Sequence, residues 1–317
     1  MIAVDSLEAL YADGEQASVH PLWVMMKDVV TPRPKPGAVP HLWSYESVRA
    51  LLDRAAGLIR AEDAERRVFM LTNPGLQPPC ATDTLFAGLQ YILPGEIAPA
   101  HRHSAFALRF IVEGSGAYSA VGGEKVIMNR GDVVLTPSWM WHDHGNESAE
   151  PMIWLDGLPL PILQAIPVNF AQPYAHPTYP SLPAAADSNL HYPWAEMQAR
   201  LDAANIPFVQ LRYVQRVEGT PISRIIGGSA ERLAPKTDAK LTRETASVIY
   251  HAVDGSGSTT INDETIVWKA RDTFAVPAWA TVTHHNTSSE PAYLFRFDDR
   301  PLLDALGLYR TEFTAPQ

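Results

Sequence analysis

Cysteine is almost absent from this chain of 317 residues, which carries only Cys80. A single thiol excludes an intrachain disulfide and a cysteine metal cluster. Basic residues are in the minority, and the net charge of −10 argues against nucleic acid or an anionic membrane surface as the main partner. The chain has no run of about 18 apolar residues and no basic segment before an apolar one, so we predict no membrane span and no signal peptide. These absences together predict a soluble, cytoplasmic protein.

Proline and glycine are abundant, with 27 and 19 residues, and they divide the chain into short segments. Such a composition favours short strands and turns over long helices. Residues 44–67 are the clearest exception, because apolar residues recur there at helical spacing after Ser44, a plausible N-cap. We also predict a short helix over residues 194–204 and a closing helix over residues 300–310.

Two β-rich parts of the chain repeat one another. The segment "FIVEGSGAYSAVGGEKVIM" matches "HAVDGSGSTTINDETIVW", and "GDVVLTPSWMWHDHGNES" matches "RDTFAVPAWATVTHHNTS". Equivalent residues are 141 positions apart in the first pair and 140 apart in the second, which implies one deletion in a turn. The matches fall on Gly, Pro, Trp and Asn, and so many are not expected by chance. We therefore predict a duplicated small β-barrel.

The second copy lacks the histidines of the first. At the positions of His101, His103 and His142 it has Thr242, Glu244 and Val282. Residues that both copies share are expected to serve the fold, whereas residues found only in the first copy are candidates for chemistry.

These three histidines are the candidate metal ligands. His101 and His103 are one residue apart on a predicted strand, so their side chains point to the same face. Such a pair alone is more often two ordinary polar residues on a half-buried strand. His142 strengthens the case, because it follows a strand and turn long enough to fold back beside the pair. Imidazole suits Fe, Zn, Cu and Ni alike, so the ligand type does not name the metal.

The segments "GEIAPAHRH" and "GDVVLTPSWMWHDHGN" resemble the two motifs of the cupin superfamily. The chain departs from the usual motifs at Trp139, where glycine is common, and at Leu108, where many cupins have a glutamate ligand. The expected ligand set is therefore three neutral imidazoles. On an octahedral ion such a set leaves about three open positions, the arrangement of non-haem Fe(II) sites that bind an organic chelate and O₂.

A narrower resemblance covers residues 65–312. With "WLDGLPLP" and the closing segment "HHNTSSEPAYLFRFDDRPLLDALGLYRTE", the chain is similar to the gentisate 1,2-dioxygenase family, which includes salicylate, 1-hydroxy-2-naphthoate and 5-nitrosalicylate dioxygenases. The resemblance implies an all-β bicupin fold of two jelly-roll barrels with a few peripheral helices. It also implies Fe(II), a homotetramer, and insertion of both atoms of O₂ between the carboxyl-bearing and hydroxyl-bearing ring carbons.

We divide the chain on this basis into four parts. Residues 1–68 form an N-terminal arm and helix, 69–157 the metal-bearing barrel, 158–207 a proline-rich linker, and 208–317 a metal-free barrel with the closing helix.

Arg109 is the candidate for binding the substrate carboxylate. An aromatic 2-hydroxycarboxylic acid can chelate iron through its carboxylate and hydroxyl, so the protein must orient the ring and balance its charge. Arg109 lies six residues after His103, on the same face of the strand, where a guanidinium can hold a carboxylate by two parallel bonds. The second copy has Tyr250 at this position. The alternative is a surface charge.

Four other residues are candidates for the site, and two of them, His144 and Asp156, match positions of the family. His144 is expected to bond a substrate oxygen or accept a proton, although His284 in the second copy leaves a structural role open. Asp156 is expected to orient His144 or a ligand histidine, or else to be a turn residue. Gly88 is expected to leave room for the substrate ring, or else to mark a bulge. Arg67 is expected to contact the carboxylate, or else to be a charged helix end.

Ala105 bears on the choice of substrate. Family members that act on gentisate usually have glutamine here, so Ala105 predicts a wider and less polar pocket and makes nitro- or halogen-substituted salicylates candidates beside gentisate.

Two other functions stay open: a non-oxidative cupin isomerase or hydrolase that uses Zn or Mn, and a non-enzymatic ligand-binding bicupin. Metal content and oxygen uptake distinguish the first of these from a dioxygenase.

Overall fold

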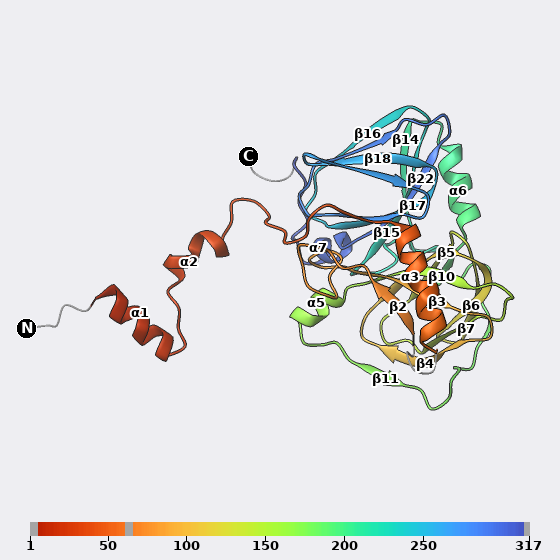
Figure 1. Cartoon of the computed structure of the whole chain (residues 1–317), viewed down its shortest axis with the longest axis horizontal. Coiled ribbons are helices and arrows are strands. Elements are labelled where there is room, and N and C mark those ends of the chain that lie inside the picture. Colours follow the sequence, from red (N-terminus) through yellow and green to blue (C-terminus); the bar gives the residue numbers. More distant parts are fainter. Residues whose placement is uncertain (1–5, 61–65, 314–317) are drawn as a thin grey trace, which may run out of the picture. The chain divides into compact units, whose positions relative to one another are not determined.

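The computed structural model describes residues 6–60 and 66–313, and strands dominate it (Figure 1). The chain divides into two compact units, Met1–Lys35 and Pro36–Gln317. The first unit holds two helices, α1 (Leu7–Gln16) and α2 (Leu22–Val29), and neither helix buries a residue. No helix among the described residues has both the length and the apolar character needed to span a membrane.

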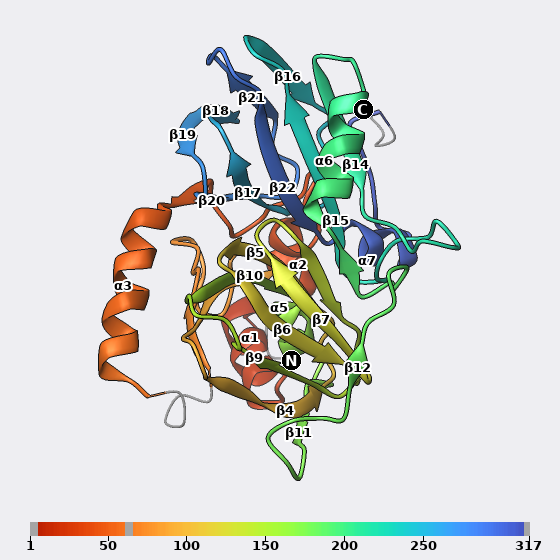
Figure 2. The ribbon, with the colours of Figure 1, turned by 90° about the vertical axis from the view of Figure 1, so that its right-hand side faces the viewer.

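The second unit contains two barrels of the same topology (Figure 2). The eight strands of the first barrel are β3 (Phe86–Ile92), β4 (Ile97–His103), β5 (Ala107–Glu113), β6 (Ser115–Val121), β7 (Glu124–Asn129), β8 (Val133–Thr136), β9 (His142–Gly145) and β10 (Met152–Leu158). The corresponding strands of the second barrel are β15 (Gly227–Leu233), β16 (Thr237–Leu241), β17 (Val248–Asp254), β18 (Ser256–Ile261), β19 (Glu264–Lys269), β20 (Thr273–Val276), β21 (Val282–Asn286) and β22 (Ala292–Asp298).

The pairing order in the two barrels confirms the predicted duplication and the bicupin fold. One sheet of the first barrel contains β8, β5, β10 and β3 in that order, and the second barrel repeats it as β20, β17, β22 and β15. The other sheet contains β4, β9, β6 and β7, which the second barrel repeats as β16, β21, β18 and β19.

Strands from outside these sets extend the sheets. They are β1 (His41–Trp43), β2 (Arg67–Met70), β11 (Ala171–Pro173), β12 (Leu182–Pro183), β13 (His191–Tyr192) and β14 (Phe208–Arg212). Three of them, β11, β12 and β13, come from the proline-rich segment that we expected to be a linker, and all three pair with strands of the first barrel. The barrel boundaries given above stay predictions.

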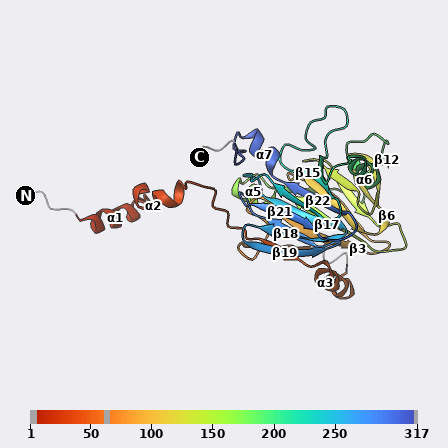
Figure 3. The ribbon, with the colours of Figure 1, turned by 90° about the horizontal axis from the view of Figure 1, so that it is seen from above.

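The remaining helices lie at the periphery of the barrels (Figure 3). They are α3 (Tyr45–Leu58), α5 (Leu160–Ala165), α6 (Trp194–Ala203) and α7 (Arg300–Ala305). The helix predicted over 44–67 is shorter, because Ile59 takes an extended conformation with φ −125°. The closing helix also stops early, since Gly307 adopts a left-handed φ of 68° that an α-helix does not contain.

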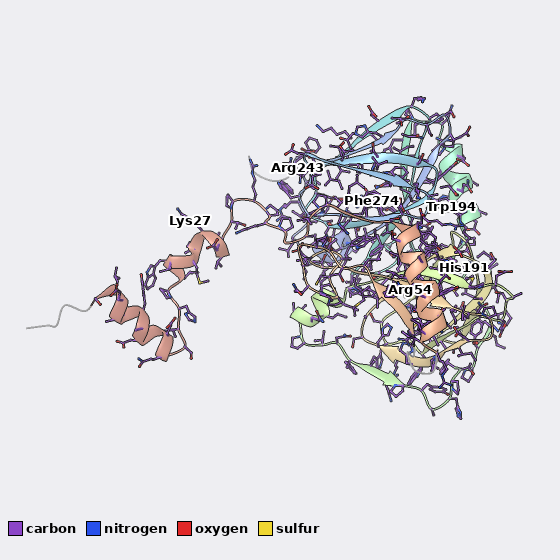
Figure 4. The ribbon with its side chains drawn as sticks, viewed as in Figure 1. Lys27, Arg54, His191, Trp194, Arg243 and Phe274 are labelled. Carbon is purple, nitrogen blue, oxygen red and sulfur yellow. The ribbon has the colours of Figure 1, made fainter. Side chains whose placement is uncertain are left out.

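The two barrels of this unit share an apolar core. Phe110 of the first barrel stacks on Phe295 of the second, with 4.5 Å between ring centroids. Trp194 packs edge-on against both Phe110 and Tyr293 and so joins α6 to the two barrels (Figure 4). Phe274 is fully buried inside the second barrel. The first barrel is thus held on a rigid partner that carries none of the three candidate ligands.

Candidate metal centre

The three candidate ligands come together on two neighbouring strands. β4 pairs with β9 in antiparallel fashion, and the register sets His101 opposite His142. The ring of His142 lies 4.1 Å from that of His101 and 4.8 Å from that of His103, centroid to centroid. One nitrogen from each ring lies within 4.8 Å of the other two. The predicted convergence of the three imidazoles is therefore present.

Backbone carbonyls orient all three rings in the same way. Nδ1 of His101, His103 and His142 lies 3.0, 2.8 and 2.9 Å from the carbonyl oxygens of Pro99, Ala105 and Met140. A proton on Nδ1 donates to the carbonyl and leaves the lone pair of Nε2 as the metal-binding atom. At His101 this nitrogen faces Nη2 of Arg66 at 2.6 Å, a contact that a bound metal ion would replace. Nε2 of His142 is buried and has no hydrogen-bond partner among the described residues. These donors therefore fit a metal ion that prefers imidazole.

Electrostatics keeps the three imidazoles neutral. Burial, assisted by Arg66, lowers the pKa of His101 to about 3. Burial and then the charge of Arg109 lower the pKa of His103 to about 4, and the same two causes lower that of His142 further. A metal ion binds the neutral form of histidine, so at neutral pH no proton has to leave these rings first.

Arg109 is not on the strand of His103 as predicted, because β4 ends at His103 and Arg109 lies on β5, in the other sheet of the barrel. Its charge still acts on His103 and His142, and its own partner is Asp156. The two residues face each other on β5 and β10, with 3.2 Å between Nε and Oδ1. Arg109 also donates to the hydroxyl of Thr136, and Asp156 accepts from Trp154 Nε1 at 3.2 Å. Both charged residues are 5% exposed. Burial raises the pKa of Asp156 and lowers that of Arg109, while each charge favours the ionised form of the other.

The carboxylate of Asp156 therefore positions Arg109. The sequence had suggested that it orients a histidine instead. Cross-strand pairing explains this result, because residues directly opposite on one face of a sheet bring their side chains together. His144 lies on β9, in the other sheet of the barrel.

His144 is buried, and both of its ring nitrogens lack a hydrogen-bond partner among the described residues. Its ring centroid lies 5.7 Å from that of His142, and burial lowers its pKa well below the usual value. The equivalent His284 differs, since its Nδ1 lies 2.8 Å from the hydroxyl of Thr259. Of these two equivalent histidines, His144 has both ring nitrogens without a hydrogen-bond partner among the described residues, whereas His284 lacks one for Nε2 alone.

Gly88 lies opposite Asp156 in β3 and has regular pairing on both sides, so the bulge that the sequence allowed is absent. A Cβ atom at this position would lie 2.8 Å from both Phe86 Cζ and Val68 Cγ1. Glycine thus lets these two apolar side chains approach the centre of the strand. Neither was singled out from the sequence, because nothing in its pattern marks them.

Arg67 does not point toward the candidate metal centre, whereas the preceding residue, Arg66, does. The guanidinium of Arg67 binds Glu96 and the carbonyl of Ile59, so we no longer assign it a substrate contact. Arg66 instead brings Nη2 to 2.7 and 2.6 Å from the two ring nitrogens of His101. Successive residues entering a strand point to opposite faces, so only one of the two arginines can face the histidines. Ala105 is buried, and its carbonyl orients His103.

Known proteins resemble this chain over almost its full length. A cupin-domain family model matches residues 88–157. Gentisate 1,2 dioxygenase 1 of Aquipseudomonas alcaligenes is 38% identical, over 95% of this chain and 94% of that protein. A 5-aminosalicylate 1,2-dioxygenase of Comamonas sp is 34% identical, over 98% of this chain and 91% of that protein.

A crystal structure of salicylate 1,2-dioxygenase from Pseudoaminobacter salicylatoxidans, in an adduct with gentisate, superimposes with a TM-score of 0.88. Its sequence is 32% identical, and the match covers 98% of this chain and 95% of that one. The two barrels, the three converging histidines and these relatives agree, and the chain belongs to the family of gentisate and salicylate 1,2-dioxygenases, cupin enzymes that cleave aromatic rings.

Proposed function

We propose that this chain is an Fe(II)-dependent dioxygenase that opens the ring of gentisate or of a related 5-substituted salicylate. Both atoms of O₂ enter between the carboxyl-bearing and hydroxyl-bearing carbons. The observation that carries the proposal is the set of three neutral imidazoles with Arg109 fixed beside them. The proposal is further supported by relatives named for gentisate and 5-aminosalicylate, and by a 61-residue match at 44% identity to a 5-nitrosalicylic acid 1,2-dioxygenase.

His101, His103 and His142 hold the metal in this proposal. Fe(II) held by these three imidazoles would supply open coordination positions for the aromatic substrate and for O₂. Arg109 donates hydrogen bonds to the substrate carboxylate, and Asp156 and Thr136 keep its guanidinium from turning away. Arg66 supplies a second positive charge next to His101. A ring nitrogen of His144 accepts a hydrogen bond from the substrate hydroxyl, a role supported by the absence of another partner for it among the described residues and by the low pKa that keeps the ring neutral.

Ala105, Gly88 and the side chains around them determine the substrate class in this proposal. Phe86 and Val68 meet over Gly88 and present apolar surface next to the strand that carries Asp156. Ala105 offers no side-chain hydrogen bond to a substituent of the ring. Both features favour a salicylate whose 5-substituent forms fewer hydrogen bonds than a hydroxyl group does.

Oxygen uptake by the Fe(II)-loaded protein tests the proposed function. The substrates are gentisate, 5-aminosalicylate, 5-nitrosalicylate, 5-chlorosalicylate, salicylate and 1-hydroxy-2-naphthoate. We expect stoichiometric oxygen consumption and loss of the aromatic absorption band with at least one of them. Ala105→Gln is the matched variant, and it is expected to shift the kcat/KM ratio toward gentisate. A protein that binds metal but consumes no oxygen with any substrate would point to the non-oxidative Zn or Mn isomerase or hydrolase instead.

We also propose a homotetramer, supported by the N-terminal unit. Its two helices bury no residue, and they expose apolar side chains, among them Leu10, Leu22, Trp23 and Met25. Several exposed apolar side chains on a short helical arm are typical of a protein contact. Light scattering is expected to give the mass of four chains for the full protein and a smaller assembly for a chain that begins at Pro36. Equal assemblies would contradict this role of the arm. The cytoplasmic location stays a prediction from composition.

A further inference from the structure

Side chains on the face of β4 and β9 that points away from the imidazoles make contacts with another segment of the chain. Arg102 lies between His101 and His103, and Asp143 lies between His142 and His144. Because side chains alternate along a strand, these two residues point away from the imidazoles. Their contacts therefore act on the backbone of the ligand strands without touching the metal or the substrate.

Arg102 is fixed on three sides. Its guanidinium carbon lies 4.4 Å from the ring centroid of Trp139 and 4.5 Å from that of Trp141. Its Nε and Nη2 donate to Oε1 of Gln172 at 3.0 and 2.6 Å. Gln172 is also the residue that faces Arg102 in the pairing of β11 with β4. A guanidinium stacked on indoles and bonded through two of its nitrogens has little freedom left.

Trp139 is present at some conformational cost. Its φ of 65° lies in the left-handed region, where residues with a side chain are strained by about 1–2 kcal/mol. This is the position at which the cupin motif usually has glycine. The indole packs on Arg102 and, at 4.4 Å between centroids, on Phe170. The stacking with Arg102 is a contact that glycine cannot make.

Asp143 is fixed by the same stretch of chain. Its side chain is 1% exposed, and Oδ2 accepts a hydrogen bond from the backbone N–H of Tyr179 at 2.7 Å. Trp141 packs on Tyr174 and Tyr179, with centroids 5.0 and 6.1 Å apart. Residues 170–179, which we name the strap, therefore contact the outer side of both ligand strands.

The second barrel offers an internal comparison. Its sheet of β16, β21, β18 and β19 has four strands, and β16 is an edge strand. In the first barrel, β11 of the strap pairs along β4 and removes that edge beside His101 and His103. Edge strands have unpaired backbone groups and are less constrained than paired ones. The second barrel pairs the equivalent stretch with a different segment: Glu244 forms a bridge with Thr311, and the backbone N–H of Glu312 donates to the carbonyl of Arg243 at 3.1 Å. Support of this edge is thus common to both barrels, and in the first barrel the strap provides it.

We propose that the strap positions the metal ligands, and that Arg102 and Asp143 are the positioning residues through which it acts. This inference rests on the proposed metal-binding function. β4 needs such support, because its register with β9 shifts between Ala98 and His101, directly before the ligands. A strand that is irregular at this point and open on its other edge would let the imidazoles move apart, and metal affinity depends on ligands that are already in place.

Metal affinity, measured by chelator competition without oxygen, tests the proposal. Partners that orient metal ligands typically contribute about 10–100-fold to affinity, so Arg102→Ala and Gln172→Ala are expected to weaken Fe(II) and Zn(II) binding within that range. Gln172→Glu keeps an acceptor for Arg102 and is expected to bind as the unchanged protein does. Saturating Fe(II) is expected to restore most of kcat in both alanine variants.

Arg243→Ala is the matched control, because Arg243 occupies the position of Arg102 in the second barrel (Figure 4). It is expected to leave metal affinity unchanged. Thermal unfolding of each metal-free variant separates folding from positioning. If the strap variants unfold at lower temperature but bind metal as tightly as the unchanged protein, the positioning role is wrong and the proposed function stands. If the unchanged protein binds no metal, the metal centre itself is wrong, and the role of the strap with it.

Discussion

Replacing His142 by alanine is expected to remove ring cleavage and to weaken metal binding by more than the about 10–100-fold that a supporting residue contributes. His142 is fully buried, and its Nε2 has no protein partner among the described residues to satisfy it in place of a metal. Removing it leaves two imidazoles, both on β4, and opens the side of the centre that β9 supplies.

Metal titration and oxygen uptake of the Fe(II)-loaded variant check this prediction. His142→Gln keeps most of the side-chain volume and separates loss of the ligand from loss of packing. His285→Ala is the control, because this half-buried histidine of the second barrel bonds Asp238 and is expected to affect neither measurement. Oxygen uptake by His142→Ala at the unchanged rate would show that the metal is held elsewhere.

Replacing Arg109 by glutamine is expected to lower kcat/KM by about 100–10,000-fold, because two charge-assisted bonds to a carboxylate contribute about 1.5–3 kcal/mol each and about 1.4 kcal/mol corresponds to a factor of ten. Arg109→Lys is expected to recover only part of this loss, since an ammonium keeps the charge but not the planar fork. The substitution also leaves Asp156 buried without its counter-charge, which costs about 3–5 kcal/mol of stability.

The double variant Arg109→Gln/Asp156→Asn distinguishes the two effects. Removing both charges is expected to restore most of the thermal stability, while kcat/KM stays low because no guanidinium binds the substrate. Steady-state kinetics and thermal unfolding of the three variants give the comparison. A double variant with the kcat/KM of the unchanged protein would mean that Arg109 serves only to neutralise Asp156.

Local spacing was enough to predict the metal centre. His101 and His103 share a face because strand geometry has a period of two, and this rule needs no tertiary information. The repeat showed which histidines belong to one copy only, and the pairing of β4 with β9 confirms that His142 joins them. Helix ends were predicted less well. The φ of Gly307 and the extended conformation of Ile59 end α7 and α3 before their apolar patterns do.

Register decided what spacing left open. Arg66 and Arg67 are adjacent in sequence, and the sequence alone does not tell which of them faces the histidines. The pairing of β2 in its sheet directs Arg66 toward His101 and Arg67 toward Glu96. In the same way, the sequence left open whether Asp156 orients His144, orients a ligand histidine or is a turn residue. The pairing of β10 with β5 assigns it to Arg109.

The amino-acid sequence by itself determined the duplicated barrel and the three histidines found in one copy only, because each depends on periodicity or on residues close along the chain. The single strand predicted to carry both His103 and Arg109 was wrong, since a turn divides it into β4 and β5, which belong to different sheets. Only the tertiary structure decided the partner of Arg109, the arginine that meets His101, and the strap behind the ligand strands. These contacts join segments far apart in sequence, such as Arg102 with Gln172 and Asp143 with Tyr179. Hydrogen bonds and stacking at such separations follow from how strands are ordered within a sheet, which no local pattern encodes.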